Sequence, residues 1–206
     1  MHSNIFLAAL TEVTSQSLRP RLTKESPLKR IFDLALCALL LPLVLPVFAC
    51  IALAIIIDDR GSPLFTQTRC GLHRRPFMIF KFRTMRDQRV TRVGHILRRT
   101  GLDETAQWLN VVRGDMSIVG PRPLTASDIT RLGWDHPHMD RRFAIPPGIT
   151  GLAQLYGGVS ERWTRSVDRL YRLRTGLWLD ARIVLWTFAI TLCGKQRIRA
   201  WLMQHR

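Results

Sequence analysis

One run of seven residues, from Arg98 to Glu104, contains the side chains that phosphate chemistry needs. It holds two arginines, a glycine and two adjacent carboxylates, and a further arginine, Arg122, follows between two prolines. Guanidinium groups bind phosphate oxygens with paired hydrogen bonds, and a carboxylate can act as a nucleophile or a metal ligand. The pattern therefore predicts a phosphoryl-transfer site in which an ionised carboxylate lies among arginines, which would keep it ionised at neutral pH.

The same acids also have an ordinary structural interpretation. Thr100 and Asp103 have the spacing of a capping box, and acids in a first helical turn complement the helix dipole. Apolar spacing predicts a helix over residues 103–112, and Gly114 is expected to end it. Because a helix N-terminus also binds phosphate, the sequence leaves both interpretations open.

The composition points to a membrane surface. The net charge of +16 and the pI near 11.4 favour an anionic partner, either nucleic acid, lipid headgroups or phosphorylated small molecules. Hydrophobic residues make up 47% of the chain, and Leu34 to Ile57 are 24 residues without a charge. Such a run is long enough for a membrane helix and has no role in a nucleic-acid binder, which remains only a charge-based alternative. The cysteines show no metal-ligand spacing.

The sequence is compatible with two courses of this apolar helix through the membrane. Pro42 and Pro46 interrupt its hydrogen bonding and predict a bend. Positive charge prefers the cytoplasmic side, and both flanks are basic. A re-entrant helix, which enters the bilayer, bends at the prolines and returns to the same face, agrees with both observations. A spanning helix with kinking prolines is the alternative. The basic residues are Lys24, Lys29 and Arg30 before it and Arg60, Arg69, Arg74 and Arg75 after it.

Shorter elements follow the apolar segment. Residues 64–69 and 77–83 alternate as two strands of a hairpin, and a short helix is predicted from Val93 and interrupted near Gly101. Ten Lys or Arg and one acid lie between Arg69 and Arg99, either as a solvated basic face or as a surface for headgroups and phosphates. A basic helix capped by Ser160 is predicted over residues 160–175. Residues 183–193 form either an interfacial or a core helix.

These elements predict a mainly helical α+β fold. It has an N-terminal re-entrant membrane helix, a small β-hairpin and amphipathic interfacial helices around an active site at the membrane surface. Residues 1–28 are predicted to be a weakly structured lead-in, residues 29–58 the re-entrant helix, and residues 59–206 a cytoplasmic, membrane-associated catalytic domain.

Several motifs in order resemble a known family, the bacterial sugar transferases, which are monotopic polyprenyl-phosphate phosphoglycosyl transferases. The resemblance extends from about Lys29 to the C-terminal helix. Leu45 stands where the family often has serine beside the bend, and Pro146 where it has arginine. The motifs that carry the resemblance are Lys29 to Asp33, Phe65-Thr66-Gln67, Lys81 to Met85, Thr91 to Gly94, Leu97 to Glu104, Asn110 to Pro123, and Pro147 to Gly151 with Gln154.

The resemblance implies a reaction at the cytoplasmic face of the bacterial inner membrane. A sugar-1-phosphate passes from a UDP-sugar to undecaprenyl phosphate, UMP is released, and Mg²⁺ assists. This is the first membrane step of an exopolysaccharide, O-antigen or glycoprotein glycan. Asp103 is implied as the nucleophile and a Mg²⁺ ligand, and Glu104 as its support. The resemblance and the charge pattern together suggest Arg98, Arg99 and Arg122 for the phosphates, and Gly148, Thr150 and Gln154 for the nucleotide loop.

Two alternatives remain beside the transferase. One is a catalytically inactive, membrane-anchored basic protein that binds or assembles anionic lipid or glycan. The other is the nucleic-acid binder, against which the apolar run argues. The identity of the sugar and the existence of a homo-oligomer are open at this stage.

Overall fold

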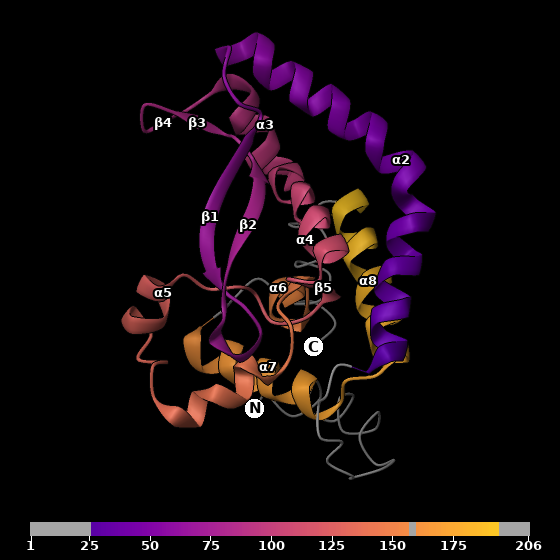
Figure 1. Cartoon of the computed structure of the whole chain (residues 1–206), viewed down its shortest axis with the longest axis vertical. Helices are drawn as coiled ribbons and strands as arrows, with labels where there is room; N and C mark the ends of the chain where they lie inside the picture. Colours follow the sequence, from indigo (N-terminus) through magenta and orange to yellow (C-terminus); the bar gives the residue numbers. More distant parts are fainter. Residues whose placement is uncertain (1–25, 157–159, 194–206) are drawn as a thin grey trace.

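A computed structural model describes residues 26–156 and 160–193. The predicted lead-in, apart from its last residues, lies outside the described residues, as do Gly157, Gly158 and the basic residues after Cys193. The described elements form a mainly helical α+β fold with three two-stranded sheets. Figure 1 shows a long helix, α2, along one flank, and the remaining elements gathered beside it.

Helix α2 (Pro27–Asp59) is continuous through both prolines, and it changes direction along its length (Figure 1). It is long and apolar enough to cross a membrane, and only 11% of its most apolar window is buried. Residues 38–50, which include both prolines, contain no buried residue. A core helix of a soluble protein would be covered along most of its length, so this apolar surface indicates association with a membrane.

Both ends of α2 contact the same folded body. At the N-terminal end, Lys29 Nζ lies 2.5 Å from an Asp180 carboxylate oxygen, and Arg30 donates to the Val111 carbonyl at 2.5 Å. At the C-terminal end, Asp59 pairs with Arg83. The helix is therefore fixed at its two ends, while its middle is left exposed.

The predicted hairpin is confirmed. Strand β1 (Leu64–Cys70) pairs antiparallel with β2 (Pro76–Phe82), and a short 3-10 turn, η1 (Leu72–Arg74), joins them. A second, smaller ladder follows, β3 (Met85–Arg86) with β4 (Arg89–Val90). Phe82 contacts Phe48 of α2 edge to face at 5.2 Å between ring centroids, so one face of the hairpin packs on α2.

The segment that carries the acids differs from the prediction in one respect. Helix α3 (Arg92–Thr100) ends at Gly101, whose φ of 77° is a left-handed conformation that favours glycine. A 3-10 helix, η2 (Leu102–Gln107), and then α4 (Trp108–Arg113) replace the single predicted helix. Gly114 ends α4, as predicted. No capping box forms, because the Thr100 hydroxyl donates backwards to the Ile96 carbonyl at 2.9 Å.

A two-stranded parallel sheet that the sequence did not predict lies in the core of the fold. Strand β5 (Ser117–Val119) pairs with β6 (Gly148–Thr150). The backbones at Gly120 and Gly148 approach so closely that a Cβ on Gly148 would collide with the Gly120 backbone. Both strands are only three residues long, which is too short for a periodic signal. Gly148 is therefore required for close packing.

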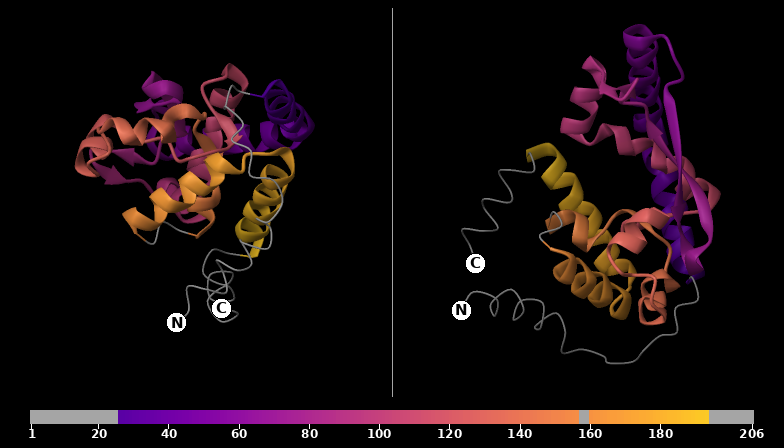
Figure 2. Two further views of the ribbon diagram at one scale, coloured as in Figure 1. Left: turned by 90° about the horizontal axis from the view of Figure 1, so that it is seen from below. Right: turned by 90° about the vertical axis from the view of Figure 1, so that its left-hand side faces the viewer.

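The rest of the chain surrounds this sheet. Ser160 caps α7 as predicted, since its hydroxyl accepts from Trp163 N. In the right-hand view of Figure 2, α2 and the hairpin lie on one side of the molecule and α7 and α8 on the other. The remaining elements are α5 (Ala126–Arg131), η3 (Pro137–Ala144), α6 (Leu152–Tyr156), α7 (Glu161–Leu173) and α8 (Leu177–Cys193).

Helix α8 combines features of both predicted alternatives. Ile183 and Ile190 are buried, whereas Trp178, Leu185 and Phe188 are 77%, 68% and 60% exposed. One side of the helix thus belongs to the core, and the other presents large apolar side chains to the exterior. Such an exposed apolar stripe is typical of a helix that lies at a membrane interface.

Candidate active site

The folded chain brings the predicted acids and two of the predicted arginines together. Asp103 and Glu104 lie on η2, which packs against β2. Arg98 reaches the same place from the last turn of α3, and Arg122 from the segment after β5. The tight Gly101 turn positions the acids, because it directs the chain from α3 into η2 beside the hairpin.

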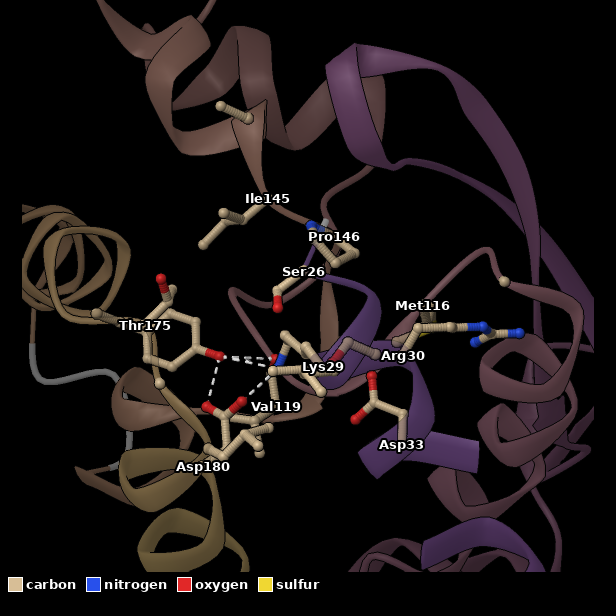
Figure 3. Close-up of a pocket in the computed structure, with 17 residues that line it drawn as sticks. Ser26, Lys29, Arg30, Asp33, Met116, Val119, Ile145, Pro146, Thr175 and Asp180 are labelled. Carbon is tan, nitrogen blue, oxygen red and sulfur yellow. Dashed lines mark hydrogen bonds and ion pairs between the residues drawn. The ribbon is translucent and has the colours of Figure 1, made fainter. Parts of the chain in front are cut away.

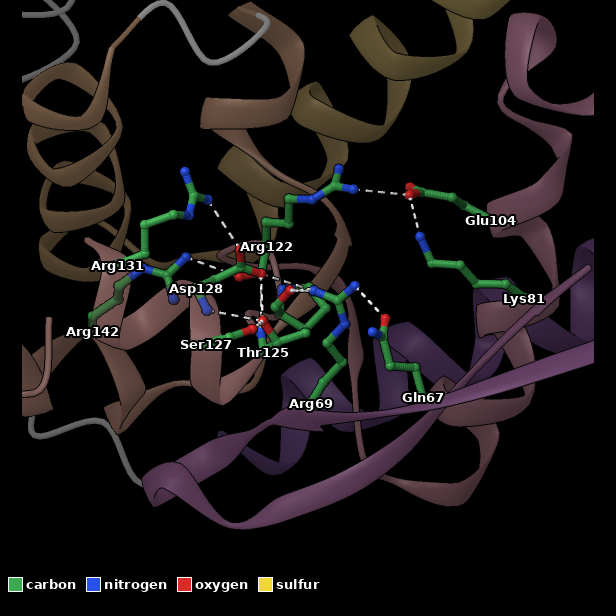
Figure 4. Close-up of polar contacts among 11 residues, drawn as sticks. Gln67, Arg69, Lys81, Glu104, Arg122, Thr125, Ser127, Asp128, Arg131 and Arg142 are labelled. Atoms are coloured by element: carbon green, nitrogen blue, oxygen red, sulfur yellow. Dashed lines mark hydrogen bonds and ion pairs between the residues drawn. The ribbon is translucent and has the colours of Figure 1, made fainter. Parts of the chain in front are cut away.

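Glu104 is held by two cations. Its Oε1 atom accepts from Lys81 Nζ at 2.8 Å and from an Arg122 guanidinium nitrogen at 3.0 Å (Figure 4). Burial raises the pKa of Glu104, but Arg122 and Lys81 together outweigh it, so the pKa lies below its ordinary value. Glu104 is therefore an ionised carboxylate that fixes the positions of Lys81 and Arg122.

Asp103 is in a different electrostatic state. Among the described residues, no other side chain forms a hydrogen bond or ion pair with its carboxylate. Burial and the neighbouring Glu104 raise the pKa of Asp103, while Lys81 and Arg98 oppose the shift. Burial and the like charge thus outweigh the cations in setting the direction of this shift, and the expectation that the carboxylate stays ionised at neutral pH remains a prediction. The surroundings thus raise the pKa of Asp103 and lower that of Glu104, as in many catalytic carboxylate pairs.

Two clefts meet at these residues. One, of about 480 Å³, runs along the hairpin, and the other, of about 620 Å³, lies between η2, α6, α7 and α8. Both are lined by Arg98, Asp103, Glu104 and Arg122. The free carboxylate of Asp103 can therefore be approached from either side, which suits a group that reacts with two substrates in turn.

Hydrogen bonds to the carbonyl groups of Arg122 and Pro123 hold the backbone at Arg122. Arg142 donates to the Arg122 carbonyl at 2.9 Å, and Arg142 is itself paired with buried Asp168 at 2.8 Å. Arg69 lies within 3.4 Å of both the Pro123 carbonyl and Asp128 (Figure 4). These contacts hold the arginine in place before a substrate arrives.

Not every predicted residue reaches the site. Arg99 is exposed and lines neither cleft. Thr150 lines the larger cleft, and its hydroxyl lies 2.6 Å from the hydroxyl of Thr187. Gln154 lines it too, and its buried Oε1 has no partner among the described residues. Gly148 lines a small pocket behind Arg122.

Two further residues contribute to the site. Lys81 bonds Glu104, and the Thr84 hydroxyl accepts from Arg98 Nε at 2.9 Å. The sequence does indicate Lys81, because this cation stands between two phenylalanines in a predicted strand. The role of Thr84 depends on how α3 folds back over the hairpin, and no local pattern indicates it.

The residues beside Asp103 are compatible with Mg²⁺ that is bound jointly with a substrate. Mg²⁺ is commonly held by one or two carboxylates, substrate phosphates and water. Asp103 offers one such carboxylate. Among the described residues no cluster of three or more His, Cys, Asp or Glu side chains could hold a metal. A bound phosphate would therefore have to supply the remaining ligands.

A third cavity, of about 490 Å³, lies at the base of α2, away from the acid pair. Figure 3 shows Lys29 and Asp180, which both line it, paired with each other. The buried Tyr171 hydroxyl donates to Asp180 at 2.8 Å, and burial together with Asp180 keeps the pKa of Tyr171 well above its ordinary value. This network anchors α2 to α8.

The fold and the site together match one family. The family model described as bacterial sugar transferase matches residues 24–194. The chain belongs to the bacterial sugar transferase family.

Particular relatives carry more specific descriptions. A UDP-glucose:undecaprenyl-phosphate glucose-1-phosphate transferase of Caulobacter vibrioides is 42% identical, over 77% of this chain and 67% of its own length. The protein of the same description in Escherichia coli K12 is 38% identical, over 78% of this chain and 39% of its own. An uncharacterised sugar transferase of Bacillus subtilis is 37% identical, over 78% and 85%. The chain thus spans well under half of the E. coli protein but most of the B. subtilis one.

Proposed function

We propose that this protein transfers a sugar-1-phosphate from a UDP-sugar to undecaprenyl phosphate and releases UMP. The observation that carries the proposal is the Asp103 carboxylate, which no other described side chain pairs with and which lies where two clefts meet among Lys81, Arg98 and Arg122. The names of the relatives support the substrate classes.

The reaction has two displacements at one phosphorus atom. An Asp103 carboxylate oxygen attacks the phosphorus that is linked to the sugar, the bond from that phosphorus to the bridging oxygen breaks, and UMP leaves with the electron pair. A phosphate oxygen of undecaprenyl phosphate then attacks the aspartyl phosphosugar and frees the carboxylate. The raised pKa of Asp103 marks a more basic oxygen than an ordinary aspartate has, which favours attack once it is ionised.

The other residues have separate roles. The guanidinium N–H groups of Arg98 and Arg122 that Thr84 and Glu104 do not use can bind phosphate oxygens through hydrogen bonds, which strengthen as charge develops on those oxygens. Glu104, fixed by Lys81 and Arg122, is a positioning residue, because both cations already occupy its Oε1. Mg²⁺, held by Asp103 and the substrate diphosphate, would neutralise phosphate charge.

The proposal includes a re-entrant course for α2 in the bacterial inner membrane, with the site facing the cytoplasm. Both ends of the helix bond to one folded body, and its exposed apolar middle contains two prolines. A helix that crossed the bilayer would separate its ends by the membrane thickness of about 30 Å and place them on opposite sides. Contacts from both ends to a single body therefore favour the re-entrant course over the spanning one.

Labelling tests the course of the helix. With single cysteines at Leu28 and Ser62 and the natural cysteines replaced, we expect a membrane-impermeant thiol reagent to label neither site in intact spheroplasts. Both sites are expected to be labelled after the membrane is permeabilised. Labelling of one flank only in intact spheroplasts would establish a spanning helix.

The acid limb of the pH profile tests the roles of the two carboxylates. Activity requires ionised Asp103, so kcat/KM for the UDP-sugar should fall as the pH decreases through the pKa of Asp103, which lies above that of an ordinary aspartate. Glu104→Gln removes a charge that raises this pKa and should move the limb to lower pH. Lys81→Met removes a charge that lowers it and should move the limb to higher pH. Shifts in the same direction for both variants would contradict this electrostatic assignment.

The proposed function itself is tested by UMP release. The purified protein in detergent, with undecaprenyl phosphate and Mg²⁺, is offered UDP-glucose, UDP-galactose and UDP-N-acetylgalactosamine, the sugars named among the relatives. We expect UMP and a lipid-linked sugar product from at least one of them. Binding of substrate without any UMP would instead favour the inactive binding protein.

A further inference from the structure

The cleft along the hairpin contains an aromatic side chain that the reaction does not use. Phe65 lines it together with Lys81 and Arg98, and Phe65 is 46% exposed. A phenylalanine left open beside cations contributes less to folding than a buried one, because nearly half of its surface still meets solvent. Its ring offers an apolar face to a planar group bound in the cleft.

The strand register places Phe65 next to the phosphate-binding cations. Phe65 is the direct cross-strand partner of Lys81, and Lys81 bonds Glu104, the neighbour of Asp103. Directly opposed side chains on one face of an antiparallel pair lie about 5 Å apart at Cβ. A molecule whose diphosphate meets Lys81, Arg98 and Asp103 therefore brings any attached planar ring within reach of Phe65.

Gln67 lies on the same face of β1, two residues further along, and also lines the cleft. Its amide oxygen accepts from Arg69 at 2.7 Å. Because a guanidinium has no acceptor, this bond fixes the orientation of the amide and leaves the NH₂ group as a donor. The cleft thus offers a hydrogen-bond donor beside an aromatic face.

We propose that the hairpin cleft binds the nucleotide half of the substrate, with Phe65 stacking on the pyrimidine base and Gln67 donating to a base carbonyl oxygen. The inference rests on the proposed function and assigns its donor substrate to one of the two clefts. A carbonyl acceptor distinguishes uracil from cytosine at the position where cytosine carries an amino group.

The larger cleft has a different character. Trp108, Leu155 and Ile190 line it, and α8, which contributes Ile190, carries an exposed apolar stripe on its other side. An apolar lining beside an interfacial helix suits a lipid phosphate whose chain stays in the bilayer. The nucleotide and the lipid thus approach Asp103 through different clefts, in separate half-reactions.

Phe65→Ala tests the assignment. In a two-step mechanism of this kind, kcat/KM for each substrate reports its own half-reaction. Loss of one base–aromatic stack is expected to lower kcat/KM for the UDP-sugar roughly tenfold, within a range of about 5- to 150-fold. The value for undecaprenyl phosphate should stay within about twofold, and Phe65→Trp should restore the first value.

Met78→Ala is the matched control, since Met78 has the same 46% exposure on the opposite face of the hairpin. It should leave both values unchanged. Gln67→Glu should reduce the preference for UDP-sugar over CDP-sugar. Suppose that the protein without substitutions releases UMP. The nucleotide assignment would then be overturned if Phe65→Ala left kcat/KM for the UDP-sugar unchanged, or if it lowered kcat/KM equally for both substrates. Absence of UMP from the unchanged protein would instead refute the proposed function.

Discussion

Asp103→Asn is expected to abolish turnover, with UMP release reduced at least about a thousandfold. The substitution keeps the shape of the side chain but removes the anionic oxygen that attacks phosphorus. No other described side chain depends on Asp103 for an ion pair, so the variant should fold and insert like the unchanged protein. Steady-state UMP release, compared at equal amounts of membrane-inserted protein, measures the effect.

Asp135→Asn provides the control, because Asp135 is an exposed acid that lines none of the three large cavities. It should retain full activity. Glu104→Gln should lose less than Asp103→Asn, since Glu104 positions cations and does not attack. If Glu104→Gln were inactive and Asp103→Asn retained turnover, the nucleophile would be the other member of the pair.

Arg122→Met is expected to have the second largest effect, a loss of about 10²-fold to 10³-fold in kcat. The Arg122 side chain is 52% exposed and lines both clefts, and Arg142 fixes the backbone of Arg122. It can therefore contact the transferred phosphoryl group in either half-reaction. We expect kcat/KM to fall for both substrates, unlike the effect of Phe65→Ala.

Arg165→Met is the control for charge and exposure. Arg165 is 44% exposed and is also paired with a glutamate, Glu161, at 2.8 Å, but it lies on α7 away from the acids. It should change activity by less than about twofold. Similar losses in both variants would show that general surface charge, such as attraction to anionic lipid, governs the rate.

The sequence predicted the elements that have strong local signals. The apolar run gave α2, the alternation gave the hairpin, and Ser160 and Gly114 marked helix boundaries that the structure confirms. The parallel pair of β5 and β6 was missed, because three-residue strands that are far apart in sequence carry no period. The close approach of Gly120 and Gly148 explains why glycine is needed there.

The candidate site was predicted in its residues but not in its electrostatics. Residue type and spacing indicated Asp103, Glu104 and Arg122, which the fold does bring together. The sequence could not indicate that Lys81 and Arg122 both bond Glu104, whereas no side chain in the described part of the chain pairs with Asp103. The direction of the Asp103 pKa shift depends on burial, which is a tertiary property. Arg99 resembles Arg98 in sequence, but its position on α3 directs it away from the clefts.

The most direct measurement is the mass of the protein after incubation with a UDP-sugar and Mg²⁺ in the absence of undecaprenyl phosphate. We predict an added mass of one sugar phosphate, located by peptide fragmentation to Asp103 and lost when undecaprenyl phosphate is supplied. Release of UMP only when both substrates are present, with no protein-bound sugar phosphate at any time, would contradict a covalent aspartyl intermediate.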